Sequence, residues 1–308
     1  MLNNTALLMM FINEGGGQKI KQVACSSNAT WFINGKGELY GCGSSYCGQQ
    51  GDNNAENSYV NINIFTKRAD NVAYITCSDT TTWYITKSGE LFGCGYGYYG
   101  QQGNGSTNNV LIFTKRADNV KYVSCDSLVT WYLGINGELF GCGANNYSNQ
   151  GAGSSASGKI YNFTKRASNV KKFICENDTT WYINNSLELY GCGANYHGQQ
   201  GGGDTSQYVY TFTKKMDNVV DVVCRSYYDN ILYEMYAQLG IINTSGELWS
   251  SSYRLFSKIA DNVSKVFCSY DTMWYIDTSG NLYGKGNNNY GQQGRGEAGY
   301  VNEFTKRP

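Results

Sequence analysis

The sequence predicts an all-β fold, a β-propeller of six four-stranded blades, with seven blades as the alternative. The first observation is a repeat, because the segment at residues 180–203, TWYINNSLELYGCGANYHGQQGGG, returns along the chain. A period near fifty residues indicates a repeat architecture, and the first four tryptophans of the repeat are 52, 48 and 50 residues apart at Trp31, Trp83, Trp131 and Trp181. The second is composition, since 38 glycines, 27 tyrosines and one proline suit short strands and tight turns. The third is that each repeat holds four strand-like pieces, which is typical of a propeller blade.

The first strand of each repeat is a short run that ends in cysteine. Apolar and polar residues alternate in it, as they do in a half-buried strand. Six such runs predict six blades; they are Ile20–Cys25, Val72–Cys77, Val120–Cys125, Val170–Cys175, Val219–Cys224 and Val263–Cys268.

The other three strands follow in a fixed order. The second strand is the T-W-Y-I run and the third is G-E-L-Y-G-C-G, and a Ser-Gly or Asn-Gly pair between them predicts a two-residue hairpin turn. The fourth strand is F-T-K-R-A-D-N-V. We expect its lysines to face the glutamates of the third strand, since opposite charges on neighbouring strands stabilise a pair and protect an edge. The fourth strands begin at Phe65, Phe113, Phe163, Phe212 and Phe256, with a truncated copy at Phe304.

The fifth repeat breaks the pattern twice. Sixteen residues separate Cys224 from Gly240, the residue at the tryptophan position, where the other repeats have six. The ten extra residues fall around 228–238. This repeat also lacks the loop between its third and fourth strands. Because loops after the first and third strands of a blade lie on one face, we infer that the insertion occupies the space of the missing loop.

Residues 1–19 precede the first repeat, and residues 20–308 form the predicted propeller. We expect the first segment either to supply a strand that closes the ring or to be an arm that docks elsewhere. Its apolar run at residues 6–12 has no positive region and no cleavage site, so it does not resemble a signal peptide. No apolar run reaches the roughly eighteen residues that span a membrane. We therefore expect the protein in a virion or in bacterial cytoplasm.

The eleven cysteines stand mostly at repeat positions. The six at the ends of the first strands should form a ring, and six thiolates do not suit zinc, which takes four ligands. We expect these cysteines to be reduced and mostly buried, because a thiol packs as a small apolar group. Cys47 stands alone in a loop and is expected to be exposed and open to oxidation.

At this point the chain resembles a known family. The segment ELYGCGANYHGQQG at residues 188–201 is similar to the regulator of chromosome condensation repeat, whose pattern is about G-x-V-Y-x-W-G-x-N-x-x-G-Q-L-G. The resemblance covers about residues 20–308. It implies a propeller that works by presenting one face to a partner, as in a divergent bacterial or phage member of that family. The chain departs from the pattern with Cys for Trp at Cys42, Cys94, Cys142 and Cys192, and with Gln for Leu at Gln50, Gln102, Gln200 and Gln293.

Several function classes are disfavoured. Lys plus Arg and Asp plus Glu are both 24, so the formal net charge is zero and nucleic-acid binding is not expected. His197 is the single histidine, and no nucleophile elbow, phosphate loop or metal motif accompanies it. We therefore predict no enzyme activity, no cofactor and no metal.

The loop tyrosines are the candidate binding residues, because tyrosine offers a rigid contact surface at low entropic cost. Those at repeated positions suggest packing between blades, and those at unrepeated positions suggest recognition. We expect the unrepeated ones to share one face of the propeller. They are Tyr98, Tyr99, Tyr208 and Tyr210 in the loops and Tyr228, Tyr233 and Tyr236 in the insertion.

These observations predict a non-enzymatic recognition module whose partner is a protein or a cell-surface glycan. A phage tail or baseplate component that binds a host surface would be one such protein. The alternatives are a structural subunit of a larger assembly, and an intracellular regulator or scaffold that binds one protein.

Overall fold

The computed structural model describes residues 19–53, 61–153, 158–176, 178–196, 198–201, 203, 206–229, 234–252, 255–269 and 272–308. Only the backbone is described at 225–229, 234–238 and 252. The chain divides into two compact units, Met1–Asn146 with Ser157–Asn169, and Tyr147–Ala156 with Val170–Pro308.

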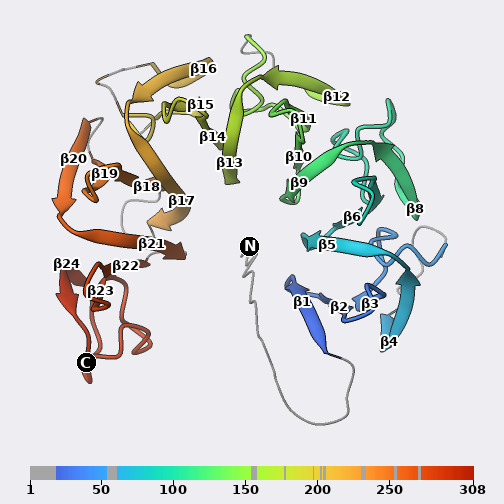
Figure 1. Cartoon of the computed structure of the whole chain (residues 1–308), viewed down its shortest axis with the longest axis horizontal. Coiled ribbons are helices and arrows are strands. Elements are labelled where there is room, and N and C mark those ends of the chain that lie inside the picture. The colour runs from blue at the N-terminus through green and yellow to red at the C-terminus, as the bar shows by residue number, and fades with distance from the viewer. Residues whose placement is uncertain are drawn as a thin grey trace. The chain divides into compact units, whose positions relative to one another are not determined.

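The described residues form six four-stranded antiparallel sheets, and in each one the strands are neighbours in chain order (Figure 1). The prediction of six four-stranded blades is confirmed. The first unit holds blades one to three. Its strands are β1 Ile20–Cys25, β2 Ala29–Asn34, β3 Leu39–Ser44, β4 Asn61–Ala69, β5 Val72–Cys77, β6 Thr81–Thr86, β7 Leu91–Gly95, β8 Val110–Ala117, β9 Val120–Cys125, β10 Val129–Gly134, β11 Leu139–Ala144 and β12 Lys159–Ala167.

The second unit holds blades four to six, and its first strands include the residues predicted for them. Its strands are β13 Val170–Glu176, β14 Thr179–Asn184, β15 Leu189–Ala194, β16 Tyr208–Met216, β17 Val219–Asp229, β18 Glu234–Asn243, β19 Leu248–Ser252, β20 Leu255–Ala260, β21 Val263–Ser269, β22 Thr272–Asp277, β23 Leu282–Gly286 and β24 Val301–Lys306.

The insertion of repeat five lengthens one hairpin. Strands β17 and β18 stay paired from Cys224↔Leu239 to Asp229↔Glu234, beyond the end of the equivalent hairpins. Strands β19 and β20 pair up to Ser252↔Leu255, which agrees with the shortened loop of this repeat. The side chains of the inserted residues lie outside the described part, so their occupation of the missing loop's space stays a prediction.

A tryptophan on a glycine anchors the core of a typical blade. Trp83 on β6 pairs with Gly93 on β7, and a Cβ built on Gly93 would lie 2.4 Å from the indole. The same arrangement occurs in blades one, four and six. A side chain larger than hydrogen has no room there, so this glycine serves packing rather than a turn. In blade five, Gly240 takes the tryptophan position, opposite Ser250.

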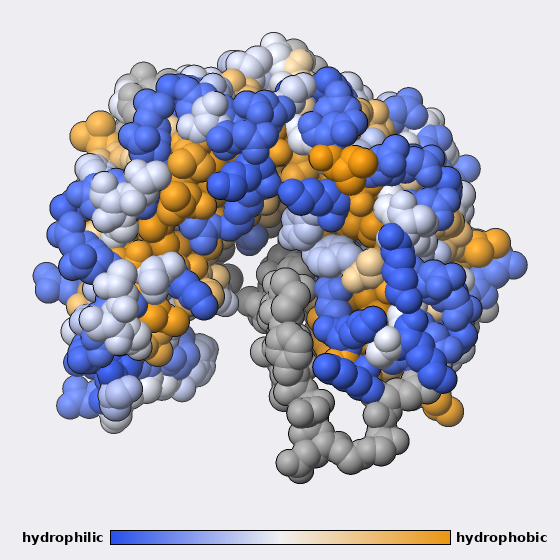
Figure 2. Space-filling view, viewed as in Figure 1, coloured by the Kyte–Doolittle hydropathy of each residue, from blue (hydrophilic) through white to orange (hydrophobic). Residues whose placement is uncertain are grey.

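The core lies between neighbouring blades of each unit. Trp31 and Leu39 of blade one pack in one buried cluster with Ile75 and Tyr84 of blade two. Phe113, on the outer strand of blade two, meets the Trp31 indole edge to face at 5.8 Å. Figure 2 shows hydrophilic residues over much of the visible surface and apolar residues further in.

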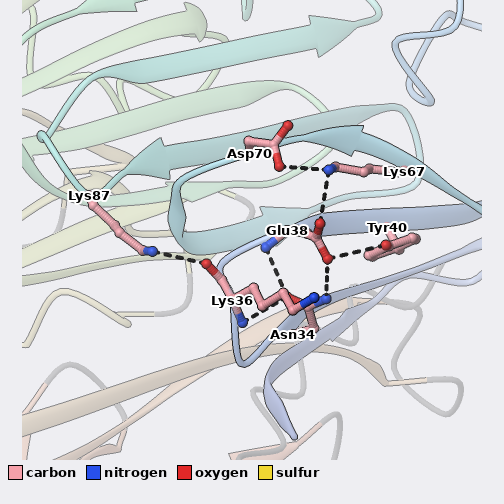
Figure 3. A network of polar contacts seen from close by, with 7 residues as sticks. All are labelled: Asn34, Lys36, Glu38, Tyr40, Lys67, Asp70 and Lys87. Atoms are coloured by element: carbon pink, nitrogen blue, oxygen red, sulfur yellow. Dashed lines mark hydrogen bonds and ion pairs between the residues drawn. The ribbon is translucent and has the colours of Figure 1, made fainter. Parts of the chain in front are cut away.

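The predicted lysine–glutamate pairs form on the outer strands. In blade one, Lys67 Nζ lies 2.9 Å from Glu38 and 2.7 Å from Asp70 (Figure 3). Hydrogen bonds from Asn34 and Lys67 lower the pKa of Glu38 to about 2. In blade three, Lys165 pairs with Glu138, and Ser168 stands where blade one has Asp70. The other pairs are Lys115–Glu90, Lys165–Glu138, Lys214–Glu188 and Lys258–Glu247.

Candidate functional site

Gly-Gln-Gln-Gly loops after the third strands contact the outer strand of the following blade, and we call this set of contacts the interblade latch. Blade five has no such loop, and in blade three the loop reads Ser-Asn-Gln-Gly. In blade one the Gln50 side chain donates to the Cys42 carbonyl at 3.0 Å, which fixes the loop to its own strand. Gly51, at φ 60°, lies so close to the Phe113 ring that a Cβ would come within 2.5 Å of it. The thiol of Cys94 in blade two donates back to the Gln49 carbonyl at 3.5 Å.

The latch recurs within each unit. In blade two, Gly103 lies against Phe163, and Cys142 donates to the Gln101 carbonyl at 3.4 Å. In the second unit, Gly151 lies against Phe212 and Gly201 against Phe256. The repeated Gln, Gly, Cys and Phe are therefore structural, and the variable residues of each loop are the ones left for recognition.

The first tyrosine cluster consists of Tyr96, Tyr98, Tyr99 and Lys159. It brings the predicted Tyr98 and Tyr99 together, with their ring centroids 5.1 Å apart and their planes nearly perpendicular. The Lys159 ammonium, at the start of β12 in the next blade, lies 3.3 Å from the centroid of Tyr98. Tyr98 remains 51 % exposed and Tyr99 is half-buried, so the cluster is ordered and still accessible.

The second tyrosine cluster consists of Tyr147, Tyr196, Tyr208 and Tyr210. Its centre is Tyr208, whose ring lies 5.0 Å from Tyr196 and 6.0 Å from Tyr210, with the hydroxyls of Tyr196 and Tyr208 hydrogen-bonded. Asp178, then burial and Tyr208, raise the pKa of Tyr147. Tyr210 is 40 % exposed. The predicted Tyr208 and Tyr210 thus lie together.

Sequence reasoning missed Lys159, Tyr96, Tyr147 and Tyr196 as members of these clusters. Tyr147 and Tyr196 stand at repeated positions, which indicates packing between blades, but Tyr196 is partly exposed. A signal for Lys159 did exist. It precedes Phe163 by four residues, as Tyr208 precedes Phe212, so both begin a fourth strand beside the preceding loop.

The side chains of the insertion tyrosines are not among the described parts of the chain. Tyr233 is not among the described residues, and Tyr228 and Tyr236 are described by backbone alone, on β17 and β18. The expectation that all seven tyrosines share one face therefore stays a prediction.

Two expectations about cysteine need correction. Cys47 is buried rather than exposed, because its loop folds around Gln49, whose side-chain oxygen accepts the Cys47 N–H at 2.7 Å. Of the six cysteines that end the first strands, only Cys77 and Cys125 are buried. The half-buried ones are Cys25, Cys175, Cys224 and Cys268; all eleven cysteines, each among the described residues, are thiols rather than disulfides.

The described ranges hold no group of three or more His, Cys, Asp or Glu residues placed to bind a metal ion. His197 is not among them. Burial raises the pKa of Cys94 and Cys142 well above its usual value, which favours the neutral thiol over a nucleophilic thiolate. Within the same ranges there is no helix of the length and apolar character that crosses a bilayer.

Comparison with known proteins agrees with this architecture. No family model matches the chain. A stretch of 92 residues, 30 % of the chain, is 33 % identical to the human probable E3 ubiquitin-protein ligase HERC4, and the match spans only 9 % of that relative. The rat and mouse proteins match equally.

Solved structures match over nearly the whole chain. Human WBSCR16 superposes with a TM-score of 0.71 at 15 % identity, covering 96 % of this chain and 83 % of WBSCR16. Yeast RCC1 (Prp20), in its complex with Kap60, gives a TM-score of 0.69 at 14 % identity, with 94 % and 74 % covered. At such identities the likeness concerns the fold, and the Gly-Gln-Gln-Gly loops of the sequence agree with it. The chain is therefore a β-propeller of the RCC1-like fold.

Proposed function

We propose that this chain is a non-enzymatic recognition module that binds a protein partner through its two tyrosine clusters. The observation that carries the proposal is that two kinds of residue in these loops have different roles. Repeated Gln and Gly residues hold the loop on the next blade, and unrepeated tyrosines beside them stay accessible. Tyr98 and Tyr210 are the most exposed of the tyrosines predicted from the sequence whose side chains the structure describes.

The clusters have the physical properties of a recognition surface. Tyr98 is packed against Tyr99 and Lys159, so its ring is ordered before any partner arrives. An ordered tyrosine loses little further entropy on binding and offers both an apolar ring and a hydroxyl. The Lys159 ammonium makes a favourable cation–π contact with the Tyr98 ring and places a positive charge at the edge of the cluster.

The structural neighbours support a protein partner. Yeast Prp20 has been solved bound to Kap60, and its binding to Gsp1p and histones has been described. Balanced charge on the present chain gives no basis for binding a polyanion. The finer version of the proposal is a phage tail or baseplate component whose partner is on a host surface, either a protein or a glycan. The alternative is that the recognition module binds one intracellular protein as its regulator or scaffold.

The test is capture of a partner from lysates and whole cells of candidate hosts, followed by a binding curve with the captured protein. The variant Tyr98→Ala with Tyr99→Ala should weaken binding by about 30-fold or more, as for a hot spot of about 2 kcal/mol. Ile135→Ala is the matched control. Ile135 is 60 % exposed and apolar but lies in the β10–β11 turn, at the opposite end of its blade from the β11–β12 loop.

Unchanged affinity in the tyrosine variant would remove the first cluster from the proposal, and the equivalent Tyr210→Ala variant tests the second. Binding that survives protease treatment of the host surface and disappears after periodate oxidation would assign a glycan instead of a protein.

A further inference from the structure

The second tyrosine cluster differs from the first in the residue that begins its fourth strand. In the first cluster, Lys159 Nζ lies 3.3 Å from the centroid of Tyr98 and 5.4 Å from that of Tyr99, so an ammonium of the chain itself covers these rings. Lys159 is the first residue of β12. The first residue of β16, in the next blade, is Tyr208, so the second cluster has a tyrosine where the first has its lysine.

An acidic residue lies beside the second cluster. Asp178 is the third residue after Cys175, in the turn between β13 and β14, and the residue at the same position of blade three is Leu128. The Asp178 carboxylate is the main cause of the raised pKa of Tyr147, so the two side chains lie close together. Asp178 is half-buried, and its backbone carbonyl accepts the Ala194 N–H at 2.9 Å, which fixes the turn to the end of the third strand. The second cluster therefore combines tyrosine rings with a carboxylate.

The tyrosines of the second cluster present ring faces in several directions. The rings of Tyr196 and Tyr208 lie 5.0 Å apart at an angle of 74°, and those of Tyr208 and Tyr210 lie 6.0 Å apart at 38°. Tyr196 is 37 % exposed and Tyr210 is 40 % exposed, so two of the rings are accessible. The four tyrosines and Asp178 all belong to the second unit, so these contacts lie within one compact part of the chain.

We propose that the second tyrosine cluster, together with Asp178, binds a lysine side chain of the protein partner. The inference rests on the proposed function and names the chemical group that one of its two clusters takes. Aromatic faces beside a carboxylate attract an alkylammonium group, because each ring face is the negative part of a quadrupole and the carboxylate supplies the opposite charge. The methylene stem of lysine also packs well on apolar rings. The chain contains its own precedent, since Lys159 lies over Tyr98.

The same reasoning excludes the first cluster as a lysine site. Lys159 already covers the ring of Tyr98, and a second ammonium at that place would meet a like charge. Leu128 stands at the position of Asp178, so the first cluster also lacks the matching carboxylate there. The first cluster therefore serves as an internal reference for the second in one molecule.

Nuclear magnetic resonance of protein with ring-labelled tyrosine tests the proposal, with N-acetyl-lysine methylamide as the probe. The control ligand is N-acetyl-norleucine methylamide, which has the same stem without the ammonium. The signals of Tyr196 and Tyr210, assigned through their phenylalanine variants, should shift saturably with the lysine probe and much less with the norleucine one. The signals of Tyr98 and Tyr99 should titrate with neither.

Two variants remove the features that carry the proposal. Asp178→Asn keeps the size of the side chain and its backbone contacts, and should weaken lysine binding about fivefold, the upper end for an accessible ion pair. Tyr210→Ala should weaken it about two- to fivefold, the range of one cation–π contact. Tyr161→Ala is the matched control and should bind like the wild type, because Tyr161 has the place of Tyr210 in the preceding blade and is 42 % exposed. If Asp178→Asn does not fold, Tyr210→Ala, at an exposed site, still decides the question.

Lysine and norleucine probes that shift the same signals equally would overturn the proposal, as would wild-type affinity for lysine in both Asp178→Asn and Tyr210→Ala. With the captured partner, acetylation of its lysines should weaken binding to the wild type more than binding to Asp178→Asn, and an equal effect on both would also overturn it. These outcomes leave the proposed function standing if Tyr210→Ala still weakens binding of the partner. A partner that binds the tyrosine variants of both clusters normally would instead refute the proposed function itself.

Discussion

Replacing Gly93 by alanine tests the tryptophan anchor of the blades. The Cβ of Gly93→Ala would lie 2.4, 2.5 and 2.6 Å from the Cζ3, Cε3 and Cη2 atoms of Trp83, where real contacts are rarely under about 3.4 Å. The indole would have to move by about 1 Å. It is fully buried and meets Phe163 of the next blade at 5.8 Å, so that movement disturbs the boundary between two blades.

The expected loss of stability follows from two opposing effects. Overpacking a well-packed core costs about 1–3 kcal/mol, and an indole with no room to move favours the upper end of that range. Alanine also restricts the unfolded chain, which offsets roughly 0.4–1 kcal/mol. We therefore expect Gly93→Ala to lower the free energy of unfolding by about 2 kcal/mol, measured as a lower denaturant midpoint at an unchanged slope.

A double-mutant cycle isolates the contact. The three indole atoms that collide are absent from phenylalanine, so Gly93→Ala should cost little in a Trp83→Phe background. Gly134→Ala is the control for glycine itself, because the nearest atoms to its built Cβ are at 3.6 and 3.7 Å. Equal losses for Gly93→Ala in the two backgrounds, or equal losses at Gly93 and Gly134, would refute the anchor.

Two further predictions concern a buried carboxyl group and the accessibility of the thiols. Burial raises the pKa of Asp126 to about 6, although the N–H groups of Leu128 and Val129 bond to it. Because this pKa lies above the unfolded value near 3.9, the group favours folding below about pH 4 and that contribution is lost as the pH rises through 6. The stability difference between wild type and Asp126→Asn should therefore change by roughly 2 kcal/mol between pH 4 and pH 7, and a difference independent of pH would contradict this. Native thiol labelling read by mass spectrometry should modify Cys42, which is half-buried, well before Cys94 and Cys142, which are fully buried; labelling at similar rates would contradict this difference in burial.

Local sequence signals predicted the strands closely. The first strands β5 and β9 begin at a valine and end at a cysteine as the repeat indicated, because alternation and turn glycines act within a few residues. Side-chain contacts across blades were not predictable in this way. Tyr98 and Lys159 are 61 positions apart and meet only because one blade's loop reaches the next blade's outer strand. The error at Cys47 has the same origin, since its burial depends on how Gln49 turns inward.

The latch also determines how recognition can vary among the blades. A loop is fixed by its Gln and Gly to the following blade, so its tip can change without loss of that anchor. The tip does not act alone, however, because its neighbour is the first residue of the next fourth strand, as Lys159 is for Tyr98 and Tyr208 is for Tyr147. Each patch of the proposed recognition surface is therefore composed by two consecutive repeats. A change in partner preference should require paired changes about 60 residues apart in sequence, and single substitutions in one loop should weaken binding more readily than they redirect it.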